Sequence, residues 1–172
     1  MSQRSLTVAI GISAAMYCTA AMAQDTVPVT PAIELVGVAE IGEVKAVKKL
    51  RFDVGEWRPA DPLASRGLVI SIRAIFPTDV NADFRPPAVT LSYSASGTWH
   101  KASCMGVSLP DVSEKGHRWF LTQSNGLVFS GLRSAGNTIT ASFLFDVPPN
   151  ISDVSFMYRG RVVLKELPLP WK

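Results

Sequence analysis

Regular alternation of apolar and polar side chains over residues 137–163, NTITASFLFDVPPNISDVSFMYRGRVV, constrains the fold more than any other stretch. One side of the extended chain carries Ile139, Ala141, Phe143, Phe145 and Val147, and the other carries Thr138, Thr140, Ser142 and Asp146, with Leu144 as an apolar exception. A period of two predicts a strand with one buried and one wet face. Pro148 and Pro149 end this strand, because proline has no N–H for the ladder. Val154, Phe156 and Tyr158 then line one face of the next strand.

Similar short apolar stretches recur along the chain and predict further strands. Residues 67–76, GLVISIRAIF, are apolar on both faces, which predicts a strand in the centre of its sheet. The other expected strands are residues 33–41, 88–93, 98–107, 118–123, 127–133 and 161–167. Asn125-Gly126 and Arg159-Gly160 are signals for tight turns. Loops are expected at residues 55–67, 77–87 and 108–117, while residues 43–50 fit either a strand or a short helix.

The spacing of these elements predicts an all-β fold. Turn signals recur about every ten residues, and connections this short join antiparallel neighbours. We therefore expect an antiparallel immunoglobulin-like β-sandwich of about seven to nine strands, with a barrel as the second choice.

The N-terminus has the three parts of a secretory signal peptide. Arg4 is positive, residues 6–18 are apolar, and Ala21-Met22-Ala23 is a small-x-small cleavage site. Tyr17 precedes Cys18, whereas a lipoprotein signal needs a small residue there. We expect residues 1–23 to be a signal peptide, 24–32 a flexible leader, 33–167 the sandwich and 168–172 a C-terminal tail. The predicted location is periplasmic or secreted.

Charge, hydrophobicity and cysteine content argue against several classes of protein. The formal net charge is +3, and cleavage would leave 16 Lys and Arg against 14 Asp and Glu. Proteins that bind nucleic acid usually carry a clear excess of clustered basic residues, so this nearly balanced charge argues against that class. No second apolar segment is long enough to span a membrane. Cys104 alone remains after cleavage, so no internal disulfide is expected, and a small buried side chain is its expected role.

The closing strands carry a resemblance to a known family. An apolar strand, the sequence FDVP, a short loop and an apolar strand ending in Tyr-x-Gly resemble the telokin-like immunoglobulin-fold domains of bacterial exported proteins. The residues that carry it are Phe143, Phe145, Asp146, Val147, Pro148, Phe156, Tyr158 and Gly160. The resemblance implies a sandwich that acts as a binding or structural module, and it implies no catalytic residue. Many such domains belong to lipoproteins. This chain differs from them, because it lacks the small residue that a lipoprotein signal needs before the cysteine.

Motifs for catalysis are missing from the sequence. It contains no GxSxG, HExxH, P-loop or GxGxxG pattern, so we expect a non-enzymatic protein without a cofactor. The alternative is a periplasmic copper-handling protein that uses His100, Cys104 and His117. Imidazole and thiolate ligands suit copper, and residues four apart in an extended strand share a face.

Tryptophans and arginines supply the candidate partner surface. We expect Trp99 and Trp119, on strands, to lie in the core. The candidate partner-binding residues are Trp57, Arg58, Phe84, Arg85 and Trp171, in predicted loops and the tail. The predicted function is an accessory subunit that recognises a protein partner or forms a homo-oligomer. A third possibility is that residues 24–32 add as a strand to the sheet edge of a neighbour.

Overall fold

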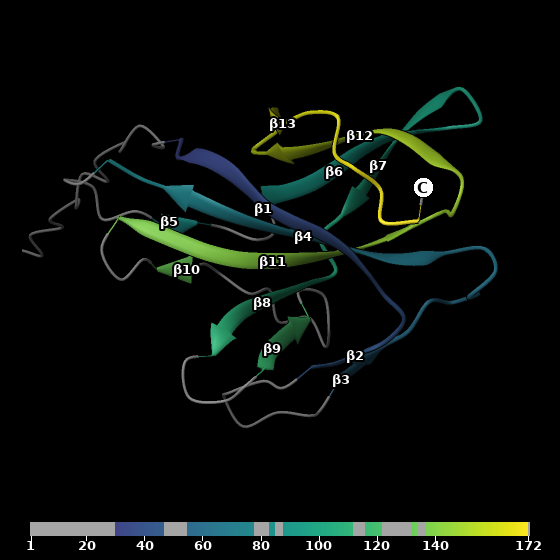
Figure 1. Cartoon of the computed structure of the whole chain (residues 1–172), viewed down its shortest axis with the longest axis horizontal. Helices are drawn as coiled ribbons and strands as arrows, with labels where there is room; N and C mark the ends of the chain where they lie inside the picture. Colours follow the sequence, from purple (N-terminus) through teal and green to yellow (C-terminus); the bar gives the residue numbers. More distant parts are fainter. Residues whose placement is uncertain are drawn as a thin grey trace, which may run out of the picture.

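A computed structural model describes residues 30–46, 55–77, 83–84, 88–111, 116–121, 132–133 and 137–171. Over these residues the protein is all-β (Figure 1). The strands are β1 (Ala32–Ile41), β2 (Val44–Ala46), β3 (Gly55–Trp57), β4 (Arg66–Ile75), β5 (Asp83–Phe84), β6 (Val89–Ala95), β7 (Thr98–Ser103), β8 (Gly106–Asp111), β9 (Gly116–Leu121), β10 (Leu132–Arg133), β11 (Thr138–Val147), β12 (Ile151–Tyr158) and β13 (Arg161–Leu164). In this part of the chain no helix has the length and apolarity needed to cross a membrane. The predicted signal peptide and the Asn125-Gly126 turn lie outside the described residues.

The strands form two larger sheets and one small one. The first sheet has the order β1-β4-β11-β8-β9-β2-β3, the second has the order β13-β12-β6-β7, and β10 pairs with β5. The pairings are antiparallel, as expected, except that β2 meets β9 in parallel at Ala46 and Trp119.

The long strands β4 and β11 lie side by side in the first sheet and are paired over their whole length, from Thr138 opposite Ile75 to Val147 opposite Arg66. One face of this pair contributes Leu68, Ile70, Phe143 and Phe145 to the main core. The prediction of a central strand at residues 67–76 is therefore confirmed.

The opposite face of β11 was expected to be wet, and here the prediction is wrong. Leu144 is fully buried, together with Val44, Trp57, Val69 and Trp119, in a second apolar cluster. Leu144 is thus no exception in a polar face but a fully buried member of this second cluster. Ser142, on the same face, is also buried and shares a 2.7 Å hydrogen bond with Ser71 on β4.

The second sheet packs its apolar face onto the first, an arrangement consistent with a β-sandwich. Val89, Leu91 and Phe156 from β6 and β12 are fully buried in the same core as Phe143 and Phe145. The Phe156 ring meets those of Phe143 and Phe145 edge to face, at centroid distances of 5.7 and 6.3 Å. Such pairs add about 0.5–1.5 kcal/mol to the gain from burial alone.

Two-residue turns close the hairpins of the second sheet. Arg159 and Gly160, between β12 and β13, have φ of 50° and 75°, and Ser96 and Gly97, between β6 and β7, have φ of 50° and 78°. Positive φ at both central residues defines the type I′ turn, whose twist matches that of the strands. The turn expected at Arg159-Gly160 is confirmed.

Several boundaries differ from the sequence expectation. The loop expected at residues 108–117 is too long at both ends, because β8 continues to Asp111 and β9 begins at Gly116, while residues 112–115 lie outside the described residues. The segment 55–67 is a loop only between β3 and β4. The strand expected over 98–107 is two strands, since the chain leaves the second sheet after β7 and enters the first at β8. Trp99 is 63% exposed on the edge strand β7, so its expected place in the core is wrong, whereas Trp119 is buried as expected.

Candidate functional site: a groove beside Arg58

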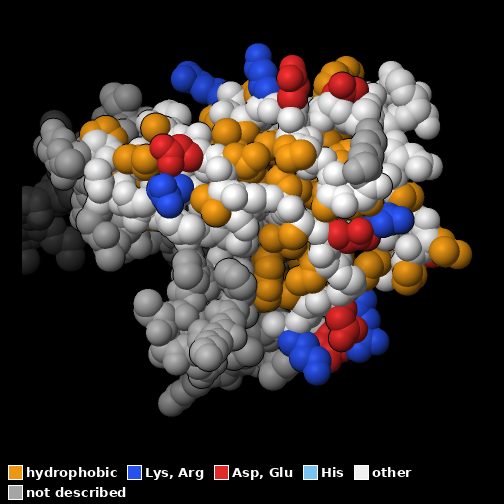
Figure 2. All heavy atoms as spheres, viewed as in Figure 1, with side chains coloured by type: hydrophobic (Ala, Val, Ile, Leu, Met, Phe, Trp, Pro, Cys, Tyr) orange, Lys and Arg blue, Asp and Glu red, His pale blue; other side chains and the backbone are white. Residues whose placement is uncertain are grey.

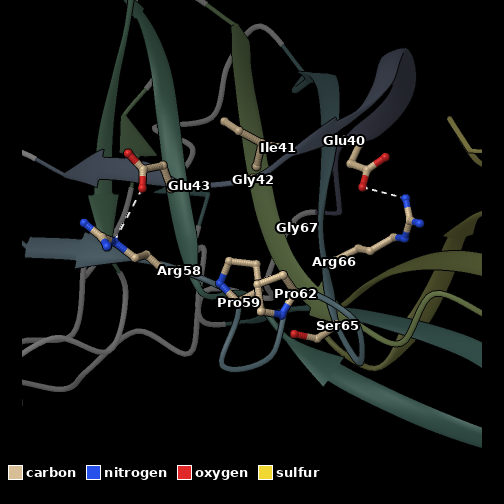
Figure 3. A pocket seen from close by; sticks show the side chains of 10 residues that line it. All are labelled: Glu40, Ile41, Gly42, Glu43, Arg58, Pro59, Pro62, Ser65, Arg66 and Gly67. Atoms are coloured by element: carbon tan, nitrogen blue, oxygen red, sulfur yellow. Dashed lines mark hydrogen bonds and ion pairs between the residues drawn. The ribbon is translucent and has the colours of Figure 1, made fainter.

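A groove of about 470 Å³ opens where β1 ends and β4 begins (Figure 3). Its lining comes from the end of β1, the segment after β3, and the start of β4. The lining residues are Glu40, Ile41, Gly42, Glu43, Arg58, Pro59, Pro62, Ser65, Arg66 and Gly67. They come from two segments, 40–43 and 58–67, which the antiparallel pairing of β1 with β4 brings together, with Ile41 opposite Gly67.

The segment between β3 and β4 is shaped by Asp61. Its Oδ1 accepts a hydrogen bond from the N–H of Leu63 at 2.9 Å, and its carbonyl accepts from the N–H groups of Ala64 and Ser65 at 3.0 and 2.8 Å. Hydrogen bonds that an aspartate accepts from backbone N–H groups two to four residues later in the chain stabilise a turn. This turn holds Pro59 and Pro62 along one side of the groove (Figure 3).

Gly67 lets the floor of the groove lie close to a tryptophan. A Cβ at this position would lie 2.7 Å from Cη2 of Trp57 and 2.9 Å from Cγ2 of Ile41, and it would also collide with the carbonyl oxygen of Ile41. Real Cβ atoms do not approach so closely, so glycine alone fits here without displacement. Trp57 lies against Gly67 in the second apolar cluster and is only 6% exposed.

Ion pairs lie at both ends of the groove. At one end Arg58 Nε is 3.4 Å from Glu43 Oε2, and Arg58 Nη2 donates to Glu56 Oε2 at 2.8 Å. At the other end Arg66 Nη1 donates to Glu40 Oε1 at 2.8 Å. The side chains of these pairs are exposed, so each pair stabilises the fold by only about 0–1 kcal/mol. Their effect is on shape and charge, because they hold two guanidinium groups at the rim.

The C-terminal tail supports the second ion pair. Leu167 is buried and its N–H donates to the carbonyl of Val154 at 2.9 Å, which ties the tail to β12. Trp171 then packs against the main core, and the guanidinium carbon of Arg66 lies 5.4 Å from its ring centroid. This cation–π contact holds Arg66 over the ring at the same time as Glu40 accepts its hydrogen bond.

One of the five expected partner-binding residues lines this groove, and two others lie against residues that line it. Arg58 is in the lining, Trp57 lies next to Gly67, and the Trp171 ring lies under Arg66. Trp57 was expected on the surface of a loop, and this is wrong, since it is a buried residue of β3. The backbone of Phe84 pairs with Leu132 in the small sheet, away from the groove. The Phe84 side chain and Arg85 lie outside the described residues.

Sequence reasoning missed the acidic partners and the glycine of the groove. Glu40 and Glu43 stand in the same short stretch, AEIGE, but nothing in it shows that two distant arginines face them. The signal that could have helped is the sequence ADP before Gly67, which places a turn-forming aspartate ahead of a strand.

The three residues of the copper alternative occupy different environments. His100 is exposed on β7 and stacks on Tyr93, with ring centroids 5.6 Å apart. Cys104 is 3% exposed, and its Sγ donates to the carbonyl of Gly106 at 3.2 Å. The strand β7 ends at Ser103, so the alternation expected to place His100 and Cys104 on one face stops before Cys104. His117 lies on β9, in the other sheet, and its side chain is outside the described part.

Burial also changes the acidity of two groups in this region. It raises the pKa of the Cys104 thiol to about 12, which favours the thiol over the thiolate that binds metals. Burial and, to a smaller extent, the negative charge of Asp146 raise the pKa of Tyr93. Within the described residues no three His, Cys, Asp or Glu side chains are grouped as metal ligands would be.

Comparisons with protein-family models, with curated proteins and with solved structures give no match to this chain.

Replacement of Gly67 tests the close packing under the groove. We expect Gly67→Ala to lower the free energy of unfolding by about 1–3 kcal/mol and to change the fluorescence of Trp57, because the new Cβ displaces Ile41 and the indole. Gly42→Ala is the matched control, since nothing lies within 4 Å of a Cβ there, and its effect should stay within about 0.5 kcal/mol. Equal effects of the two substitutions in urea unfolding would contradict this packing.

Thiol labelling tests the environment of Cys104. In the form without residues 1–23, we expect a thiol reagent at about pH 8 to label the native protein at least 100-fold more slowly than the urea-unfolded chain. The reason is that a thiol with a pKa of about 12 is almost fully protonated there, and its labelling accelerates only as the pH rises toward that value. Native labelling as fast as that of the unfolded chain would show an accessible thiolate and would favour the copper alternative.

Proposed function

We propose that the chain is an exported, non-enzymatic accessory protein that recognises a partner protein through the groove beside Arg58. In this proposal residues 1–23 direct export, and the two sheets form an immunoglobulin-like sandwich that carries the groove. The observation that carries the proposal is that Arg58 lines the groove while Trp57 and Trp171 lie against two other lining residues, Gly67 and Arg66.

The chemistry of the groove suits a peptide segment of a protein. Its sides combine the apolar rings of Pro59 and Pro62 with the Ile41 side chain, and both ends present arginine. Arginine and tryptophan are over-represented at the energetic centres of protein interfaces. Each arginine is neutralised by a nearby glutamate, which argues against a dedicated site for a highly charged ligand such as nucleic acid.

Rigidity supports the same proposal. Gly67 in the lining lies against the buried Trp57, and Arg66 lies over Trp171, which packs against the main core. A preformed site loses less conformational entropy when it binds, so more of the contact energy appears as affinity.

Affinity capture with matched arginine variants tests the proposal. The tagged form containing residues 24–172 is incubated with periplasmic extract of the host cell, and captured proteins are quantified against the bait. We expect one stoichiometric partner with the unaltered protein and at least about tenfold less of it with Arg58→Ala. Arg73→Ala is the control, because Arg73 makes a comparable exposed ion pair with Glu34 outside the groove.

Two outcomes of this experiment would contradict the proposal. Capture that is equal for the Arg58→Ala and unaltered proteins would remove the groove from recognition. A clean monomer that carries stoichiometric copper in metal analysis of the same eluate would support the alternative with His100, Cys104 and His117.

A further inference from the structure

The strand β1 forms an open edge of the seven-stranded sheet. Its hydrogen-bonded neighbour is β4, and no other described strand pairs with it. An edge strand presents a row of backbone N–H and C=O groups that another strand can pair with. At ten residues, β1 is as long as β4 and β11, the longest strands described.

The side chains of β1 do little to prevent such pairing. Its sequence, AIELVGVAEI, has no lysine or proline, which often protect natural edges, and none of its ten residues is buried. Leu35 and Val36 are 38% and 54% exposed. Hydrophobic side chains gather in the middle of the face shown in Figure 2, across which β1 runs in Figure 1.

Both charges on β1 already have partners within the chain. Glu34 pairs with Arg73 at 3.4 Å and Glu40 pairs with Arg66 at 2.8 Å, and both arginines belong to β4. A strand that brought its own charges to this edge would find no unpaired countercharge on β1. The occupant that fits is therefore an apolar strand with few charges, and β1 itself is such a strand.

A β-bulge gives β1 an unusual pattern of faces. The register against β4 shifts between Leu35 and Gly37, so that Val36 is the extra residue. Partners across a ladder share a face, and this places Ile33, Leu35, Val38 and Glu40, opposite Ala74, Ile72, Ile70 and Leu68, on the side of the main core. The other face carries Ala32, Glu34, Gly37, Ala39 and Ile41.

This pattern is unchanged when the strand is reversed end to end. If Ala32 is placed opposite Ile41 of a second antiparallel copy, Glu34 meets Ala39, and both residues of each pair outside the bulge at Val36 belong to the same face. Likewise Leu35 meets Val38 on the core side. No two glutamates face each other in this register, whereas an ordinary ten-residue strand of strict alternation would bring opposite faces together.

We propose that two copies of this chain form a dimer in which their β1 strands pair antiparallel from end to end, with the bulge at the two-fold axis. The pairing joins two seven-stranded sheets into one continuous sheet and covers both open edges. Val162 on the neighbouring edge strand β13 is also exposed, and β13 lies beside β1, so it adds apolar surface next to the interface. A two-fold contact of this kind closes on itself and leaves neither β1 edge open for a third copy.

Sedimentation analysis of residues 24–172, which include every described residue, tests the dimer. We expect a reversible monomer–dimer equilibrium with a dissociation constant in the micromolar range. Val36→Lys should raise this constant by about 100-fold or more, because it places two like charges near the two-fold axis. Trp99→Lys, on the edge strand of the other sheet, should leave the equilibrium unchanged. A monomer at all concentrations, or equal effects of the two lysines, would overturn the proposal.

Disulfide formation tests the register independently of Val36. Mixed Leu35→Cys and Val38→Cys proteins should cross-link under mild oxidation, because paired residues lie about 5 Å apart between Cα atoms. Neither variant alone should cross-link, because the two equivalent cysteines of such a dimer are three residues, or about 10 Å, apart along the strands. Equal cross-linking in all three samples would overturn the end-to-end register. Arg58→Ala should leave the dimer intact, so this inference and the proposed function can fail separately.

Discussion

The pairing of β4 with β11 places ten residues of each strand side by side, and both faces of that pair are covered by apolar side chains. Burial of a large apolar side chain contributes about 1.5–3 kcal/mol, so Phe143 and Phe145 alone outweigh all the exposed ion pairs around the groove. The core on one face joins the second sheet through Phe156. The smaller cluster on the other face holds Trp57 and thereby supports the groove.

Gly67 is the residue where this central pair meets the candidate site. It lies in β4 opposite Asp146 on one side and Ile41 on the other, and its missing side chain leaves room for the Trp57 ring. A change in the packing around β4 is therefore transmitted directly to the groove. The tail contributes from the other direction, because Trp171 joins the main core and also holds Arg66.

The local parts of this fold could be predicted from the sequence. Alternation identified β11 and β12, and the Arg159-Gly160 turn followed from residues adjacent in the chain. Burial that depends on distant segments could not be predicted. Trp57 and Trp99 show this most clearly, since the residue expected in a loop is buried by the second cluster and the one expected in the core lies on an open edge.

The candidate site was predicted only in part for the same reason. Arg58 and Trp171 were identified by residue type, but Glu40, Arg66 and Gly67 become neighbours only through the pairing of β1 with β4. The bulge at Val36 also left no recognisable signal in a strand of apolar residues. It explains how Ile33 and Val38, which are five residues apart, can both pack on the main core.

Native-state hydrogen exchange measures the central role of β4 and β11 most directly. If this pair is the most stable unit of the protein, the slowest amides lie in residues 68–74 and 141–145, and they exchange only through global unfolding. Slower exchange in β6 and β12 than in β4 and β11 would contradict the account, because the second sheet would then be the unit on which the groove and its support depend.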